Sequence, residues 1–70
     1  MPRVRVDPER LARALVLNGY SFVSVDQLAN MLGISTRSAG RILAELRRRG
    51  LATRWSRRTY KLILSAVAPE

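Results

Sequence analysis

The chain has 70 residues, which is enough for one small domain with one modest core. It contains no cysteine and no histidine, which excludes a disulfide framework, thiolate chemistry and the usual zinc and imidazole sites. Its carboxylates are scattered rather than paired, and no glycine-rich phosphate loop is present. We therefore expect no enzyme, no cofactor, no bound metal and no small-molecule ligand.

The net charge of +8 is concentrated in one part of the chain. Between Arg37 and Lys61 the only acidic residue is Glu45, whereas basic and acidic residues balance in the rest of the chain. Such asymmetry indicates a polyanionic partner, because each neutralised phosphate releases condensed counterions. The sequence has no signal-peptide pattern and no apolar run that could cross a bilayer. We therefore expect a cytoplasmic protein, associated with the nucleoid or the ribosome, with no membrane partner.

The first helix is predicted to begin at Pro8, a residue that fits the first helical position, with Asp7 as its cap. It is predicted to stop at Asn18, because Gly19 suits the left-handed residue that follows a helix. The apolar positions expected to face the core are Leu11, Ala12, Ala14 and Leu15. A brief extended piece over residues 21–23 follows.

The second helix is predicted to begin at Ser24. Ser24 and Gln27 have the spacing of a capping box, and Val23 and Leu28 have the spacing of a hydrophobic staple. Gly33 ends the helix. The positions expected to face the core are Val25, Leu28, Ala29 and Leu32.

The third helix, capped by Ser35 and ending before Gly50, is amphipathic. Helical spacing places on one face the apolar residues Ala39, Ile42, Leu43 and Leu46. The opposite face carries Arg37, Arg41 and Arg48, with the small residues Gly40 and Ala44 between or beside them. A helix fits the major groove of B-DNA, and the arginine fork matches both phosphate oxygens and the acceptor edge of guanine. A cationic face that is merely solvated is the simpler interpretation of the same pattern.

Beyond Gly50 the apolar period changes from that of a helix to that of a strand, which predicts a two-stranded hairpin with a basic tip at Arg57 and Arg58. The residues predicted to share a face are Leu51, Thr53 and Trp55 on the first strand, and Tyr60, Leu62 and Leu64 on the second. We expect Trp55 and Tyr60 to make core or cross-strand contacts rather than to stack on bases.

This order of elements resembles the winged helix-turn-helix over essentially the whole chain. Residues 28–35 look like its second helix and turn, and residues 38–51 look like its recognition helix and exit. The resemblance implies an α+β fold, with three helices and a short two- or three-stranded antiparallel sheet. We expect a short basic arm over 1–6, the winged domain over 7–65 and a tail over 66–70.

Two winged-helix families resemble the chain most. In small prokaryotic and archaeal transcription regulators, an Ile-Ser turn, a polar triplet and an Arg-Ile-Leu run recur at the recognition helix, as they do here over residues 34–43. The S-twenty-five-type protein of the small ribosomal subunit resembles residues 20–65 without a gap, and shares Leu28, Leu32, Ile34, Ala39, Leu43, Glu45, Leu46 and Gly50. The chain departs from that second family at Val25, where the family has proline, and at Gly40, where it has arginine.

Resemblance to the regulators implies a transcription regulator or chromatin-type protein, which binds duplex DNA with helix 3 in the major groove and a basic wing on the backbone or in the minor groove. The residues then expected at base edges are Thr36, Arg37, Gly40, Arg41 and Ala44, and those expected at phosphates are Ser35, Arg47 and Arg48. The wing and its strands add to this predicted site Arg54, Arg57, Arg58 and Lys61. Two alternatives stay open: a ribosomal RNA-binding protein of the S-twenty-five type and a protein-docking winged-helix module. The sequence also leaves the oligomeric state open between a monomer and a weak dimer.

Overall fold

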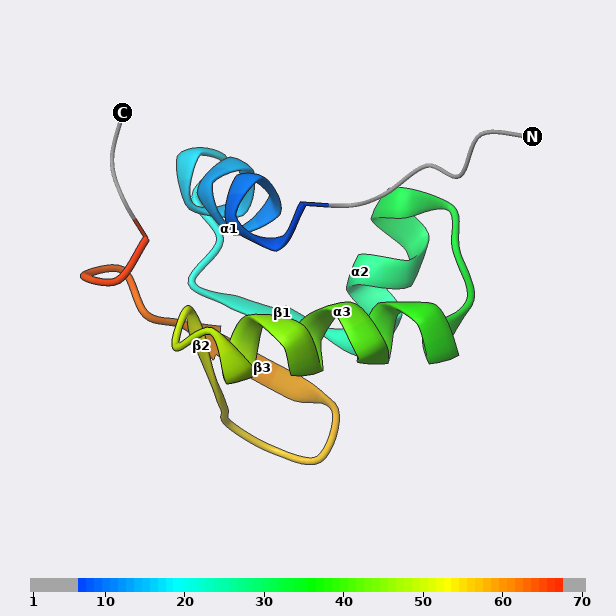
Figure 1. Cartoon of the computed structure of the whole chain (residues 1–70). Coiled ribbons are helices and arrows are strands. Elements are labelled where there is room, and N and C mark those ends of the chain that lie inside the picture. Colours follow the sequence, from blue (N-terminus) through cyan, green and yellow to red (C-terminus); the bar gives the residue numbers. More distant parts are fainter. Residues whose placement is uncertain (1–6, 68–70) are drawn as a thin grey trace.

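The computed structural model describes residues 7–67, which form three helices and three strands. In chain order the elements are α1 (Pro8–Leu17), β1 (Phe22–Ser24), α2 (Val25–Leu32), α3 (Thr36–Arg48), β2 (Ala52–Arg54) and β3 (Thr59–Leu62). In Figure 1, α3 runs across the front of the molecule, α1 lies above it, and the loop between β2 and β3 projects below it. The predicted basic arm over 1–6, and residues 68–70 of the predicted tail, lie outside the described residues.

The helices begin where the capping signals predicted. Ser24 and Gln27 form both hydrogen bonds of the capping box, 3.0 and 3.4 Å long. The Asp7 carboxylate and the Ser35 hydroxyl each accept a hydrogen bond from a backbone N–H in the first turn of their helix, at 3.0 and 3.1 Å. These bonds fix the start of each helix, because the first N–H groups of a helix have no partner within it.

All three helices also end alike. A glycine with positive φ follows each helix, and the N–H of the next residue donates to the carbonyl five positions earlier, at 2.9–3.0 Å. This helix ending has its largest effect on the fold at Gly33, where φ is +66°. An L-residue with a side chain rarely adopts this conformation. The chain therefore reverses sharply, and only Gly33 and Ile34 separate α2 from the Ser35 cap of α3.

The inner faces of the helices and the sheet form one hydrophobic core. Its largest fully buried side chains are Leu28, Leu43, Leu46, Leu62 and Val23. The predicted stripe of α3 is confirmed, because Ala39, Leu43 and Leu46 are buried and Ile42 packs at the edge of the core. Helix α3 is the central element, since α1, α2 and β2 all pack against it.

Two residues predicted to face the core are exposed. Ala14 is exposed because α1 packs mainly against α3, and a narrow stripe of Ala12 and Leu15 fills that contact. Leu32 is exposed because it is the last residue of α2, at the margin of the core.

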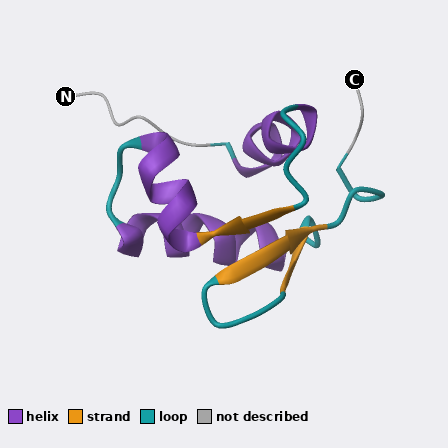
Figure 2. Cartoon of the chain, turned by 180° about the vertical axis from the view of Figure 1, so that it is seen from behind, coloured by secondary structure: helices purple, strands orange, loops and turns teal. Residues whose placement is uncertain are grey.

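The sheet is three-stranded and antiparallel, in the order β1-β3-β2 (Figure 2). Strand β1 is the short extended piece expected before the second helix, and it pairs Val23 with Tyr60. Strand β2 pairs Ala52 with Leu62, so the core-facing positions of the hairpin are Ala52, Tyr60 and Leu62. Strand β3 is thus the central strand, with β1 paired along one edge and β2 along the other.

The predicted alternation of the hairpin is wrong on the first strand and beyond the second. Leu51 is buried, but it precedes β2, and the register with β3 turns Thr53 and Trp55 to the outer face. Leu64 is exposed because β3 ends at Leu62. The chain then turns back, the Val67 N–H donates to the Ile63 carbonyl at 3.2 Å, and the Val67 side chain is buried. The packed core thus includes a residue of the segment predicted as a tail.

Candidate nucleic-acid interface

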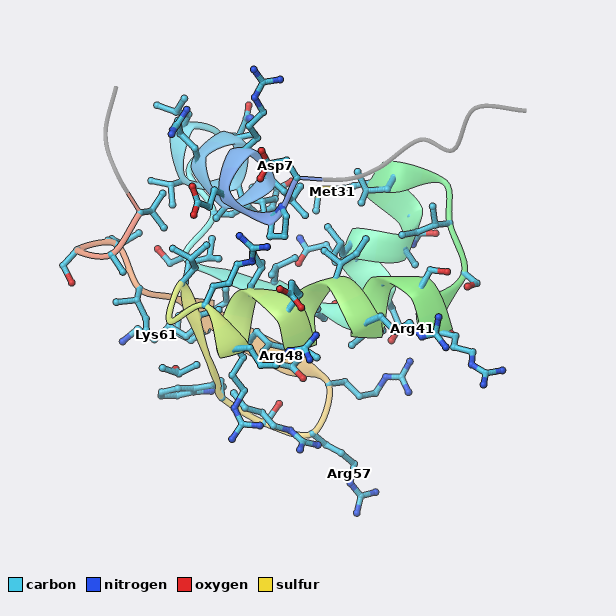
Figure 3. All side chains as sticks on the ribbon, viewed as in Figure 1. Asp7, Met31, Arg41, Arg48, Arg57 and Lys61 are labelled. Carbon is cyan, nitrogen blue, oxygen red and sulfur yellow. The ribbon has the colours of Figure 1, made fainter. Side chains whose placement is uncertain are left out.

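The outer face of α3 is a row of exposed arginines with one small residue among them. Arg37, Arg41, Ala44 and Arg48 follow the spacing i, i+4, i+7, i+11, which places them on one side of a helix. The rise of an α-helix separates the first and last by about 16 Å. Figure 3 shows Arg41 and Arg48 projecting from this side, with Arg57 projecting from the hairpin loop below.

Within residues 7–67, three exposed arginines of α3 have no intramolecular partner. Among the described residues, the guanidinium groups of Arg37, Arg41 and Arg47 have neither a hydrogen bond nor an ion pair. A shallow open hollow on α3 is lined by Arg41, Ala44, Arg47 and Arg48. Beside it, a Cβ added at Gly40 would meet nothing within 4 Å. Arg37, Arg41 and Arg47 therefore have no competing carboxylate among the described residues, and a ligand can approach the helix surface between them closely.

The N-terminus of α3 presents further donors, which belong to the backbone. The Ser35 hydroxyl already accepts a hydrogen bond from the Ser38 N–H and donates one to Ser38 Oγ, each 3.1 Å long. Within the described part of the chain, the N–H groups of Thr36 and Arg37 have no acceptor. These N–H groups lie at the positive end of the helix dipole, where anions are stabilised. At this end of α3 the backbone N–H groups of Thr36 and Arg37 are therefore better placed to bind a phosphate than the Ser35 hydroxyl, which is already hydrogen-bonded to Ser38.

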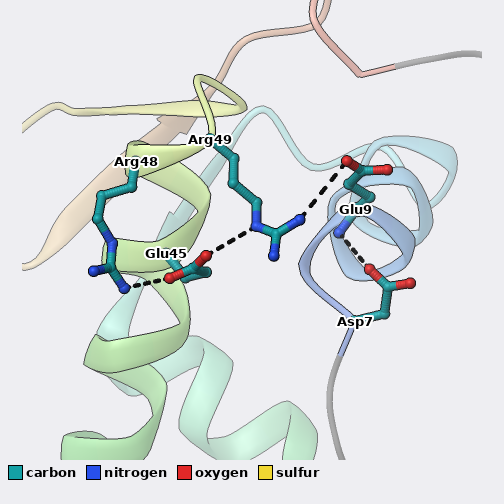
Figure 4. Close-up of polar contacts among 5 residues, drawn as sticks. All are labelled: Asp7, Glu9, Glu45, Arg48 and Arg49. Atoms are coloured by element: carbon teal, nitrogen blue, oxygen red, sulfur yellow. Dashed lines mark hydrogen bonds and ion pairs between the residues drawn. The ribbon is translucent and has the colours of Figure 1, made fainter.

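Glu45 organises the C-terminal end of α3 (Figure 4). Its carboxylate pairs with Arg48 on one side and accepts a 2.9 Å hydrogen bond from Arg49 Nε on the other. Arg49 Nη1 also lies 3.8 Å from Oε2 of Glu9 in α1, so Arg49 links α3 to α1 through ion pairs with Glu45 and Glu9. The hydrogen bond from Arg49, with the charge of Arg48, lowers the pKa of Glu45 below its ordinary value. Arg48, predicted to meet phosphate, therefore already has a carboxylate partner.

The wing, the loop over residues 55–58 between β2 and β3, carries one free guanidinium. Arg54 folds over this loop and donates to the carbonyls of Ser56 and Arg57, at 3.4 and 3.2 Å. Arg58 pairs with Asp26 through two hydrogen bonds of 2.8 and 3.1 Å. The Arg57 side chain has no such partner among the described residues, and it projects outward (Figure 3).

Lys61 is not brought together with the other predicted site residues. Its amine lies on the outer face of the sheet, 5.9 Å from the ring centroid of Phe22 and 5.8 Å from that of Trp55. In Figure 3 it lies well away from Arg41 and Arg57. The two rings meet edge to face with centroids 5.2 Å apart, and Trp55 is 64% exposed. Trp55 thus packs against β1 across the sheet, whereas Tyr60 is in the core as expected.

The sequence interpretation missed three residues that shape this surface: Asp26, Glu45 and Arg49. The pair of Glu45 and Arg49 has the i, i+4 spacing of a helical ion pair, a signal that was present in the sequence. Asp26 had no local signal, because its partner Arg58 is 32 positions away.

Other kinds of site are not seen in residues 7–67. No group of three or more potential metal-ligating side chains occurs there. No helix in that range is long and apolar enough to span a bilayer.

Comparison with known proteins places the chain in one family. The family model of the Crp-like helix-turn-helix domain matches residues 9–66, a range that contains β1, α2, α3, β2 and β3 and most of α1. No curated protein and no solved structure matches the chain. The resemblance to the S-twenty-five-type ribosomal protein stays a prediction. The winged fold and the family match agree, and the chain belongs to the Crp-like helix-turn-helix family of DNA-binding domains.

Proposed function

We propose that this domain acts in transcription regulation by binding duplex DNA, with α3 in the major groove and the wing on the sugar-phosphate backbone. The observation that carries the proposal is the outer face of α3. Arg37, Arg41 and Arg47 have no partner among residues 7–67, and they flank Gly40 and Ala44, which add almost no bulk. A helix needs such a face to sit deep in a groove.

Arg37 and Arg41 are the residues proposed to read bases. They are one turn apart, so about 6 Å separates them along the axis, close to two base-pair steps. Each guanidinium can donate two parallel hydrogen bonds to O6 and N7 of guanine. We therefore expect a preference for guanine at two nearby positions of the site, with Thr36, Gly40 and Ala44 against neighbouring base edges.

Phosphate contacts fall to the ends of α3 and to the wing. The N–H groups of Thr36 and Arg37 suit a phosphate at the helix N-terminus. Arg47 suits a phosphate further along, and Arg57 suits one beside the wing. Arg48 would join them by exchanging part of its contact with Glu45 for a phosphate. Arg54, Arg58 and Lys61 are left out of the proposed interface because each already contacts other groups of the chain.

The test is a salt titration of binding to matched duplex DNA and to structured RNA, followed by fluorescence anisotropy. Arg41→Ala should cost about 1–3 kcal/mol and relax the preference at one base position. Arg57→Ala should weaken binding to all sequences and reduce the salt slope by about 1. The matched control is Arg10→Ala, which removes one exposed positive charge from α1.

Three outcomes would contradict parts of the proposal. Equal losses on every sequence from Arg37→Ala, Arg41→Ala and Arg57→Ala would mean backbone contacts without base reading. A loss from Arg10→Ala as large as that from Arg41→Ala would mean that net charge alone drives binding. Tighter binding to structured RNA than to duplex DNA would favour the ribosomal alternative.

A further inference from the structure

We infer that Asp26 and Arg58 form a brace that fixes the wing to the start of α2, so that Arg57 is held in position for the DNA backbone. This inference rests on the proposed function, but it assigns Arg58 a different role from that of a phosphate ligand. It also gives a role in DNA binding to an acidic residue, Asp26, which a phosphate would repel.

The brace consists of two hydrogen bonds between segments far apart in the sequence, and a backbone hydrogen bond lies beside it. Arg58 Nη2 lies 2.8 Å from Asp26 Oδ1, and Arg58 Nε lies 3.1 Å from Asp26 Oδ2. This parallel arrangement is the geometry that gives an arginine–carboxylate pair its directional strength. The Val25 N–H also donates to the Arg58 carbonyl at 2.8 Å. Both the backbone and the side chain of Arg58 are thus tied to the first turn of α2.

The rest of the wing is held by hydrogen bonds within the loop itself. A restraint on Arg58 at one end of the loop therefore also restrains Arg57. The N–H groups of Trp55 and Ser56 donate to the Thr59 carbonyl at 2.9 and 3.0 Å. The guanidinium of Arg54, the last residue of β2, donates hydrogen bonds to the carbonyls of Ser56 and Arg57 in the loop. Two of the three arginines in or beside the loop are therefore used to shape it, and only Arg57 is left to meet a ligand.

The solvent exposure of Asp26 and Arg58 determines how much their pairing contributes to the stability of the domain. The Arg58 and Asp26 side chains are 56% and 59% exposed, so the pair adds little to global stability. Its effect is local, because it joins an exposed loop to the first turn of α2 and not to the core. Losing it should leave the domain folded and release the wing.

The two roles for Arg58 predict opposite effects of Asp26→Asn. If Arg58 bound phosphate, this change would free its guanidinium and remove a repelling charge, so affinity for duplex DNA would rise. If the pair is a brace, affinity falls although the protein has become more positive. The sign of one measurement therefore separates the two roles.

The experiment combines duplex binding with backbone relaxation of the Arg57 amide by nuclear magnetic resonance. Asp26→Asn and Arg58→Gln should each weaken binding by about two- to fivefold, and the double variant by no more than either single one. Arg57→Ala should cost less in the Asp26→Asn background than in the parent chain. In the free protein, both single variants should make the Arg57 amide more mobile, and the exchanged pair Asp26→Arg with Arg58→Asp should restore its order. Circular dichroism checks that each variant is folded.

Unchanged or tighter binding by Asp26→Asn would overturn the brace, as would an Arg57 amide whose order is the same in all variants. These results differ from a failure of the proposed function, which would appear as an absence of salt-dependent duplex binding by the parent chain. In that case the relaxation measurement on the free protein still decides whether the pair restrains the wing.

Discussion

Replacing Gly40 by alanine should raise stability and lower DNA affinity at the same time. Gly40 lies in the middle of α3 with a negative φ, and an added Cβ would meet nothing within 4 Å of the protein. Nothing in the fold therefore requires glycine there. In the proposed complex, however, the new methyl group would point toward the floor of the groove.

The stability change follows from helix propensity alone. Glycine inside a helix is less favourable than alanine by about 0.5–1 kcal/mol, so the melting temperature should rise by about 2–8 °C for a domain of this size. The binding change follows from close contact. A methyl group forced into a packed contact costs about 1–3 kcal/mol, which corresponds to a loss of affinity of about five- to 150-fold.

Thermal unfolding and duplex titration of the same sample test both parts. The control is Gly33→Ala, where the space is equally open but φ is +66°. There the strained backbone should destabilise the domain by about 1 kcal/mol or more. A lower melting temperature for Gly40→Ala would refute the reasoning about the helix. Unchanged affinity would show that Gly40 does not face DNA.

Three further predictions concern the core, the charge network and the sheet surface. Leu43 is fully buried at the centre of the core, so Leu43→Ala should lower the free energy of unfolding by about 2–5 kcal/mol in urea titrations; a loss below about 1 kcal/mol would contradict the packing described. Because the pKa of Glu45 is lowered by its bond from Arg49, its contribution to stability is present at neutral pH and is lost as the pH falls through that pKa. The stability difference between the parent chain and Glu45→Gln should therefore be full above the ordinary pKa of a glutamate, about 4.3, and decrease as the pH falls below that value; a difference that does not change with pH would be evidence against this pairing. Trp55, the single tryptophan, should show the red-shifted emission of an exposed indole; because its ring packs on Phe22 of β1, DNA at the tip of the wing should not bury it further, and a large blue shift on binding would mean that DNA covers this ring at the base of the wing.

Much of the fold could be predicted because its signals are local. Each helix start depends on a side chain within three residues of the N–H that it caps, and each helix end depends on one glycine. The two faces of α3 follow from spacing within 13 residues. The same locality explains why the sequence indicated the row of arginines on α3 correctly as an exposed face.

Local signals along the chain were enough to predict the order of helices and strands, the tight turn between α2 and α3, and the cationic face of α3. Which arginines have a partner within residues 7–67 depends instead on how the chain packs, because Arg58 pairs with Asp26, a residue 32 positions away. The orientation of Trp55 likewise depends on the register between β2 and β3, which turns this side chain to the outer face of the sheet. Side-chain pattern and caps act over a few residues, whereas strand register and long-range ion pairs depend on how distant segments pack. Local pattern therefore predicted the cationic surface, and packing determined which of its side chains have no partner among the described residues.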